Sequence, residues 1–190
     1  MKKILTFLFI SVFISNTNAQ NQIKGHEYVD LGLGTKWATC NVGASQPYEY
    51  GDFYHWGKIS TESDNTYTSG EYDIGGNRRF DVARAKWGGS WRMPTRREIL
   101  QLIRSCKWQW TSMNGVKGCK VIGPNGNSIF LPAAGDSDAM SRRNIGKHGT
   151  YWSSTPIEND KAYVLYFSPE KVNIEQNLRW DGMMVRPVSD

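Results

Sequence analysis

The sequence has few of the residues that bind metals or act as nucleophiles. It contains three cysteines and three histidines among 190 residues, and their spacing matches no zinc-binding motif. It also lacks the Gly-x-Ser-x-Gly elbow of hydrolases, the His-Glu-x-x-His helix of metalloproteases and a glycine-rich phosphate-binding loop. Glu158 and Asp160 stand close together in polar sequence, which favours a solvated loop over general acid–base catalysis. We therefore expect a protein that is not an enzyme and that needs no cofactor or metal.

Long apolar runs are also scarce, and the one that is present stands near the N-terminus. Lys2 and Lys3 precede an apolar run at 4–14, and the small residues Thr17-Asn18-Ala19 follow it. This order predicts a signal peptide over the first 19 residues, cleaved before Gln20. The run is shorter than the ~20 apolar residues of a transmembrane helix, and no other stretch approaches that length. We expect an exported protein, periplasmic, on the cell surface or secreted, with no transmembrane anchor after cleavage.

The charge balance does not favour a nucleic-acid partner. The formal net charge is +5, and loss of Lys2 and Lys3 with the signal peptide lowers it to +3 (5 − 2). Basic residues cluster at Arg78-Arg79 and Arg142-Arg143, but acidic residues are interleaved with the basic ones. Export also argues against nucleic acid, and a basic patch on such a protein would suit acidic glycans.

The three cysteines leave the disulfide state open. Exported proteins can hold disulfides, but an odd number leaves at least one thiol unpaired. A Cys106–Cys119 bridge would close a short loop, whereas a Cys40–Cys106 bridge would join an N-terminal strand to a helix. The third possibility is that all three are small buried hydrophobic residues.

The clearest local pattern is a helix in the middle of the chain. Thr95 and Glu98 have the spacing of a capping box. Apolar residues from Ile99 to Cys106 then repeat at helical spacing, so the sequence predicts an amphipathic helix over 95–107 that packs on the core. A shorter helix is predicted over 81–87, because a pair of glycines follows it.

Loops and turns separate the remaining elements. Residues 43–77 are rich in Gly, Ser, Tyr, Asp and Asn and lack periodicity, which predicts a long loop, pinned by Tyr54 and Trp56. The polar segment 136–149 is predicted to be a second loop. Asparagine–glycine pairs, which tolerate positive φ, predict hairpin turns at 114–115 and 125–126.

Short strands account for the rest of the chain. The predicted strands are 27–31, 36–42, 118–123, 128–131, 151–154, 161–167, 171–175 and 183–188. Two early strands, two helices and a strand-rich second half together predict an α+β fold.

Three short motifs resemble a known family of secreted domains. Gly-Gly-Ser-Trp-Arg-Met-Pro-Thr at 88–95, Tyr-Trp-Ser-Ser at 151–154 and Val-Arg-Pro-Val at 185–188 are similar to motifs of the Fibrobacter succinogenes major paralogous (FISUMP) domain family of Bacteroidetes. The resemblance implies a C-type-lectin-like fold, with two helices and a mainly antiparallel, strand-rich second half. It also implies that the last strand pairs with the first, so that the termini are adjacent. The domain would span 27–190, after a short N-terminal extension at 20–26.

Two related groups of proteins bear on catalysis and calcium binding. The formylglycine-generating enzymes depend on a pair of cysteines late in the chain, whereas no cysteine follows Cys119 here. Calcium-dependent lectins of the superfold use a Glu-Pro-Asn or Gln-Pro-Asp loop, but Gln46-Pro47-Tyr48 lacks the carboxylate. A calcium site would draw instead on Asp136, Asp138 and Asp181. The resemblance therefore implies neither the oxidase chemistry nor a metal-dependent sugar site.

The FISUMP family is also related to retroelement-diversified receptor-binding proteins. This relationship implies a binding surface near the C-terminus. In those proteins constant scaffold residues alternate with variable outward residues. The implied scaffold is Tyr151, Trp152, Ser153, Ser154, Ala162, Tyr163, Leu165, Phe167, Arg179, Gly182, Val185 and Arg186. The implied outward positions are Val164, Tyr166, Glu175, Asn177, Trp180 and Asp181, joined by the loop residues Glu158 and Asn159. Tyrosine and tryptophan suit such a surface, because they offer a large contact area with few torsions to order.

These observations predict a non-catalytic module that binds a glycan or a protein at the cell envelope or outside the cell. The contacts would come from the C-terminal loops. Two alternatives stay open: a structural subunit or tip component of a cell-surface assembly, and an enzyme of the formylglycine-generating-like superfamily. An N-terminal segment at 20–25 able to add a strand to a partner would favour the first alternative, and cysteine-dependent turnover would favour the second.

Overall fold

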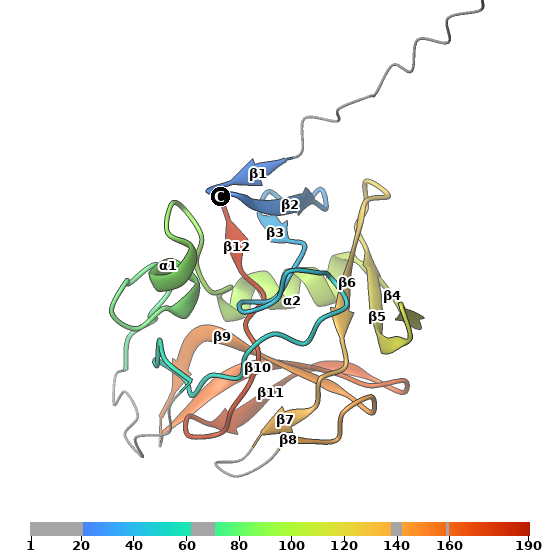
Figure 1. Ribbon diagram of the computed structural model, residues 1–190. Coiled ribbons are helices and arrows are strands. Elements are labelled where there is room, and N and C mark those ends of the chain that lie inside the picture. The colour runs from blue at the N-terminus through green and yellow to red at the C-terminus, as the bar shows by residue number, and fades with distance from the viewer. Residues whose placement is uncertain (1–20, 62–70, 138–141, 159) are drawn as a thin grey trace, which may run out of the picture.

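The computed structural model describes residues 21–61, 71–137, 142–158 and 160–190. The predicted signal peptide at 1–19 therefore lies outside the described residues. The described chain is mostly β-sheet, with two short helices, α1 (Val82–Trp87) and α2 (Arg96–Ser105). This composition fits the α+β class that the sequence predicts. Helix α2 crosses the middle of the molecule, with sheets above, below and beside it in Figure 1.

The two ends of the described chain meet in one sheet. Its strands are β1 (Gln22–Ile23), β2 (His26–Asp30), β3 (Lys36–Ala38) and β12 (Val188–Ser189), in the order β1-β2-β3-β12. The last strand pairs with β3 rather than with the first strand, and Val188 lies opposite Trp37. The C-terminus lies beside β1 in Figure 1. Residues 22–23 of the expected N-terminal extension are thus part of the sheet.

Two predicted strands are shorter than the sequence pattern suggests. The strand expected over 36–42 ends at Ala38, and the strand expected over 183–188 is reduced to β12 at its end. Met183 and Met184 instead form single bridges to Tyr54 and Tyr151, which belong to different parts of the chain. The C-terminal segment passes from one partner to the next, so no continuous ladder forms along it.

A three-stranded sheet follows α2. It contains β4 (Lys107–Met113), β5 (Val116–Ile122) and β6 (Ser128–Pro132), in the order β4-β5-β6. The predicted hairpin turn at Asn114-Gly115 is confirmed, and both residues have positive φ, 49° and 82°. No strand is predicted over β4, and the predicted helix reaches Lys107, whereas the backbone is already extended at Cys106.

The second half forms another antiparallel sheet with a small hairpin beside it. Strands β9 (Gly149–Ile157), β10 (Lys161–Phe167) and β11 (Val172–Leu178) pair in the order β11-β10-β9. The predicted loop at 136–149 is wrong in part, since β7 (Asp136–Ser137) pairs with β8 (Arg142–Arg143) within it. Ser137 also exchanges two backbone hydrogen bonds with Gly182, which gives this short strand a tertiary partner that the local sequence does not indicate.

Both helices begin at the caps that their sequences supply. Thr95 accepts the backbone N–H of Glu98, and Glu98 in turn accepts the backbone N–H of Thr95, so the predicted capping box is confirmed. Helix α2 is two residues shorter than predicted at its C-terminal end and buries Ile99 and Leu102. Asp81 caps α1 by accepting the backbone N–H groups of Ala83 and Arg84.

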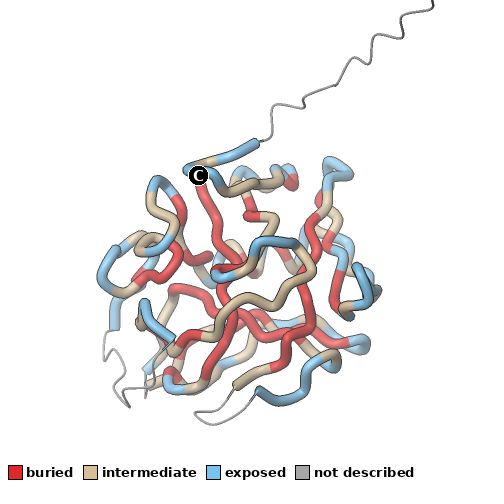
Figure 2. The backbone as a smooth tube through the Cα atoms, in the orientation of Figure 1, coloured by how far each residue is buried: buried red, intermediate tan, exposed pale blue. Residues whose placement is uncertain are grey.

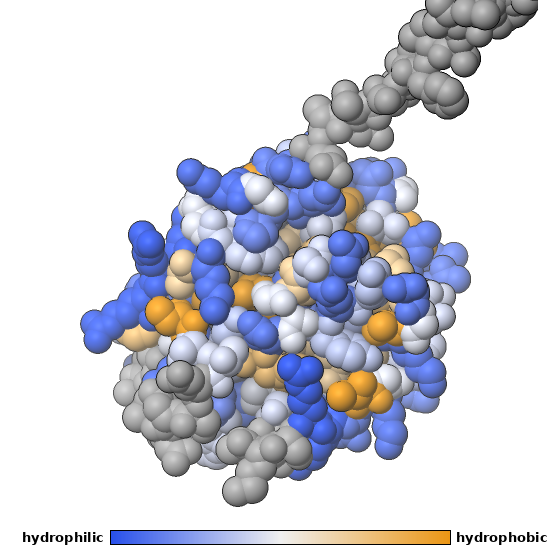
Figure 3. Space-filling view, viewed as in Figure 1, coloured by the Kyte–Doolittle hydropathy of each residue, from blue (hydrophilic) through white to orange (hydrophobic). Residues whose placement is uncertain are grey.

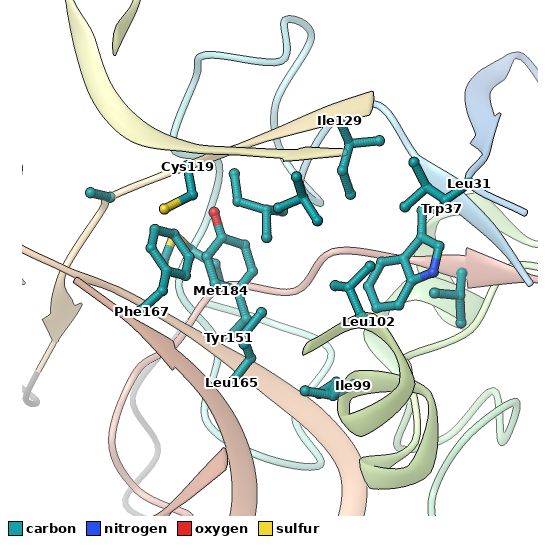
Figure 4. Packing of buried hydrophobic residues seen from close by; sticks show 14 of the residues in the cluster. Leu31, Trp37, Ile99, Leu102, Cys119, Ile129, Tyr151, Leu165, Phe167 and Met184 are labelled. Carbon is teal, nitrogen blue, oxygen red and sulfur yellow. The ribbon is translucent and has the colours of Figure 1, made fainter. Parts of the chain in front are cut away.

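Two clusters of buried side chains hold these elements together. The first includes Trp37, Leu102 and Phe167 and joins the first sheet, α2 and the second half (Figure 4). The second is built around Trp56 and Trp152. Figure 2 shows the buried stretches running through the centre of the molecule and the exposed stretches at its turns.

The described parts of the predicted loop at 43–77 are fixed by tertiary hydrogen bonds. The indole N–H of Trp56 donates to the carbonyl of Ser153 at 2.9 Å, and that of Trp152 donates to the carbonyl of Tyr54 at 2.7 Å. Both Tyr54 and Trp56 are buried, as their predicted pinning role requires.

Arg186 is a buried cation that binds neutral oxygens. Its side chain is 1% exposed. Its Nε donates to Asn41 Oδ1 at 2.8 Å, and its Nη1 donates to the carbonyls of Ala38 and Thr39 at 3.0 and 2.5 Å. Its Nη2 donates to the carbonyl of Phe130 at 3.0 Å. One side chain thereby joins the chain after β3 to β6 and to the C-terminal segment.

Arg186→Lys should lower the free energy of unfolding by about 3 kcal/mol or more. A lysine ammonium cannot reach all four acceptors, and each buried carbonyl left without a donor costs roughly 1–3 kcal/mol. Urea denaturation measures the loss. The matched control is Arg104→Lys on the exposed side of α2, expected to change stability by less than ~0.5 kcal/mol. Equal, small effects of the two substitutions would contradict the role given to Arg186.

Candidate functional site

Four of the predicted outward residues, Val164, Tyr166, Glu175 and Asn177, lie on one face of the β9–β10–β11 sheet. Residues directly opposite each other in an antiparallel pair point to the same face. The register places Tyr166 opposite Asn173, Val164 opposite Glu175 and Ala162 opposite Asn177. These four residues therefore share a face.

Tyr166 is surrounded by charged and aromatic groups from four parts of the chain. Lys171 Nζ lies 4.6 Å from the centroid of the Tyr166 ring and donates to Glu175 Oε1 at 2.7 Å. The His148 ring centroid lies 5.1 Å from that of Tyr166. His148 Nε2 in turn lies 3.8 Å from Asp136 Oδ1 on β7. These five residues, Asp136, His148, Tyr166, Lys171 and Glu175, are called the Tyr166 surface below.

The titratable groups of the Tyr166 surface are two carboxyl groups, an amine, an imidazole and a phenol. Burial is the largest influence on His148 and lowers the pKa of its imidazole, although Asp136 and Glu175 act in the opposite direction. The ring is therefore mainly neutral at pH 7. The hydrogen bond to Glu175 raises the pKa of Lys171, which stays charged. A neutral imidazole, a phenol, an ammonium group and two carboxylates can together donate and accept hydrogen bonds beside an aromatic ring.

Trp180 and Asp181 lie at the far end of β11 from Tyr166. Tyr166 is opposite Asn173, whereas the turn that carries Trp180 follows Leu178. At about 3.3 Å per residue, Asn173 and Leu178 are ~16 Å apart along β11. The Trp180 side chain is 43% exposed, and the turn is joined to β7 because Gly182 pairs with Ser137. The β7–β8 hairpin thus connects the Trp180 turn to the Tyr166 surface.

Two other predicted site residues stand apart from this surface. The Asn177 side chain takes part in the fold, since its Oδ1 accepts the backbone N–H of Leu178 and its Nδ2 lies 4.0 Å from Met183 Sδ. Glu158 lines a separate cavity of about 430 Å³ at the end of β9, together with Glu71 and Pro156. Asn159 lies outside the described residues.

Val164 is not an outward residue, contrary to the alternation argument. Its side chain is 1% exposed and packs in the second core cluster with Trp152, Met183 and Val185. The C-terminal segment covers this part of the sheet, so both faces of β10 are buried there. On the face of β10 that carries Ala162, Val164 and Tyr166, only Tyr166 is partly exposed.

Arg179 supports the site without facing solvent. It is 3% exposed, and its guanidinium lies 4.5 Å from the centroid of the Trp56 ring. Its Nε and Nη2 donate to the carbonyls of Lys161 and Ile157, both at 3.1 Å. Arg179 therefore fixes the start of the Trp180 turn against the β9–β10 connection.

His148 and Lys171 belong to the site but were not among the predicted residues. The sequence gives no signal for His148, because only the pairing of β9 with β10 places it beside Tyr166. Lys171 follows the turn after β10, and no spacing rule relates it to both Tyr166 and Glu175. Figure 3 shows a face that is mainly hydrophilic, with small separate apolar patches, so a broad apolar interface is not visible on that side.

The cysteines and acidic residues form no metal site in the part of the chain that the structure describes. No three His, Cys, Asp or Glu side chains gather there as metal ligands would. Asp138, a candidate for calcium, lies outside that part. Cys40, Cys106 and Cys119 are each free, and burial raises the pKa of the Cys119 thiol to about 12. None of the described helices is long and apolar enough to cross a membrane.

Comparison with protein-family models, with curated proteins and with solved structures finds no match for this chain.

His148 should make the stability of the protein fall below about pH 6.5. Its folded-state pKa is lowered, so the unfolded chain binds the proton first as the pH falls. The free energy of unfolding begins to fall near the unfolded-state pKa of ~6.5, and this fall stops below the folded-state pKa. Urea denaturation between pH 8 and pH 5 should therefore show a smaller loss for His148→Gln than for the wild type. Parallel pH profiles for the two proteins would contradict this assignment.

Proposed function

We propose that this chain is an exported, non-catalytic recognition protein of the FISUMP family, with a C-type-lectin-like fold. It binds a glycan or a protein through the Tyr166 surface and the adjoining Trp180 turn. The order of the three motifs supports the family. The joining of β12 to the N-terminal sheet and the helix started by Thr95 support the fold.

The motif residues act as scaffold, which leaves the candidate site free for recognition. Trp91, Trp152 and Arg186 are each no more than 1% exposed. In contrast to these buried side chains, Tyr166 and Glu175 are half-buried and Trp180 is exposed. A rigid core that presents partly exposed loop residues is the usual arrangement of binding proteins.

The exposure of Trp180 is the observation that carries the proposal. The chain has eight tryptophans, of which Trp37, Trp56, Trp91 and Trp152 are fully buried. Trp180 is 43% exposed although Arg179 and Gly182 fix the backbone on either side of it. A large aromatic side chain on a fixed turn gives contact area at a low cost in conformational entropy.

A structural subunit of a cell-surface assembly is a second candidate, and β4 favours it. This seven-residue strand is at the edge of its sheet and pairs only with β5 among the described strands. Proline and charged residues usually protect an edge strand from pairing with another chain. Strand β4 contains no proline and only one charged residue, Lys107. A partner that adds a strand would pair with β4, far from the Trp180 turn in sequence.

Tyr166→Ala with Trp180→Ala should abolish ligand binding and change the melting temperature by less than about 4 °C. Binding is measured with the protein lacking its first 19 residues on arrays of glycans and host proteins. A loss of ~1 kcal/mol lowers the melting temperature of a domain of this size by about 2–4 °C. Retained binding, or a fall of more than ~8 °C, would contradict the assignment of these residues to the binding surface.

The matched control for this double variant is Met113→Ala, which alters an exposed apolar side chain at the β4–β5 turn. It should leave the array signal unchanged. If Met113→Ala removes the signal and the double variant does not, the β4 edge is the binding element and the second candidate is preferred. The array is also read with a calcium chelator, which should have no effect on a signal that needs no metal.

A further inference from the structure

A second cavity lies at the end of the molecule that carries the first sheet. Its volume is about 400 Å³, within the range of ~300–1,000 Å³ usual for small-ligand sites. It is lined by the β1–β2 hairpin, by the chain that follows β3, by the loop at 44–47 and by Trp87 of α1. In Figure 1 this end is opposite β7 and β8, so the cavity is separate from the Tyr166 surface.

Hydrogen bonds from outside the cavity hold its walls in place. The indole N–H of Trp91 donates to the carbonyl of Ile23 at 2.8 Å and fixes the β1–β2 hairpin. Glu49 Oε2 accepts the backbone N–H of Ser45 at 2.7 Å and that of Gln46 at 3.1 Å, which fixes the loop. A ligand would therefore lose little binding free energy in ordering the protein.

One wall of the cavity is aromatic and uncharged. The rings of His26 and Trp87 are stacked with their centroids 3.7 Å apart and their planes 6° from parallel. Burial lowers the pKa of His26, so this imidazole is mainly neutral at pH 7. Trp87 packs edge-on against Trp91 at 5.3 Å, which fixes its orientation.

The remaining walls are polar but carry little charge. They include the hydroxyl of Thr39, the amide of Gln46 and the carboxylate of Glu27, and none of the described residues that line the cavity is a lysine or an arginine. An anion would meet Glu27 without a compensating cation, and an apolar ligand would leave the polar groups without partners. A cation would need an open aromatic face, but His26 covers the face of Trp87 on which it stacks.

We propose that this cavity binds a neutral saccharide of one or two rings. The amide, hydroxyl and carboxylate groups bond to the sugar hydroxyls, and apolar C–H groups of the sugar contact the edges of the stacked His26 and Trp87 rings. This site is additional to the Tyr166 surface and does not depend on the function proposed for that surface.

Cys40 provides an internal reporter of occupancy. It lines the cavity and is partly exposed. Burial raises the pKa of the thiols of Cys106 and Cys119, which suppresses their reactive thiolate forms. A thiol reagent should therefore modify Cys40 first, as peptide mapping by mass spectrometry would show.

The experiment measures the rate of Cys40 modification in the presence of common neutral mono- and disaccharides, of glucuronate and of choline. The indole N–H resonance of Trp87, assigned with Trp87→Phe, is followed by NMR in the same samples. At least one neutral saccharide should slow the modification and shift this resonance, whereas glucuronate and choline should do neither. Silence of both readouts for every neutral saccharide, or an equal response to glucuronate or choline, would overturn the proposal.

Matched variants separate this cavity from the surface proposed above. Gln46→Ala should weaken the response roughly 3–10-fold, the usual effect of one lost hydrogen bond, whereas Gln109→Ala on exposed β4 should not. The Tyr166→Ala/Trp180→Ala variant should respond like the wild type. Loss of the response in that double variant would place saccharide binding on the Tyr166 surface and overturn the assignment to this cavity.

Discussion

The guanidinium of Arg186 holds together segments that are far apart in the sequence. It donates to the carbonyl of Ala38 at the end of β3 and to that of Thr39 just after it, to the Asn41 side chain and to a carbonyl of β6. A buried charge is costly unless all its donors are satisfied, so each acceptor must stay in place. This requirement fixes the N-terminal sheet, β6 and the C-terminal segment relative to one another.

The candidate site follows from that fixed C-terminal segment. Before Arg186, the carbonyl of Met184 accepts the backbone N–H of Trp152, and Met183 pairs with Tyr54. The turn that precedes them is fixed at Arg179 and again at Gly182. Trp180 and Asp181 are therefore presented on a turn whose two ends are both anchored. A binding surface gains from such support, because contacts on a rigid backbone need little ordering on association.

Elements set by neighbouring residues could be predicted from the sequence, whereas elements set by distant partners could not. The helix begun by Thr95 and the turn at Asn114-Gly115 depend on local chemistry, and both were predicted. Strand β10 has the predicted bounds because its aromatic and branched residues favour a strand. The β7–β8 hairpin is not predicted, because its partner Gly182 lies much later in the chain.

The candidate site shows the same division. Strand alternation placed Tyr166 on a partly exposed face, but it also placed Val164 there, and Val164 is buried by the C-terminal segment. The place of His148 beside Tyr166 depends on the register of β9 with β10, which no pattern of polar residues reveals. Trp180 and Tyr166 are near each other in the sequence, but the length of β11 separates them in the structure.

The central claim is that ligand contacts lie on the Tyr166 surface and the Trp180 turn. Hydrogen–deuterium exchange with and without the strongest ligand found on the arrays tests this claim most directly. The account predicts slower exchange at 135–137, 146–149, 165–173 and 179–182 when the ligand is bound. Slower exchange confined to β4, or to the cavity beside the β1–β2 hairpin, would contradict it.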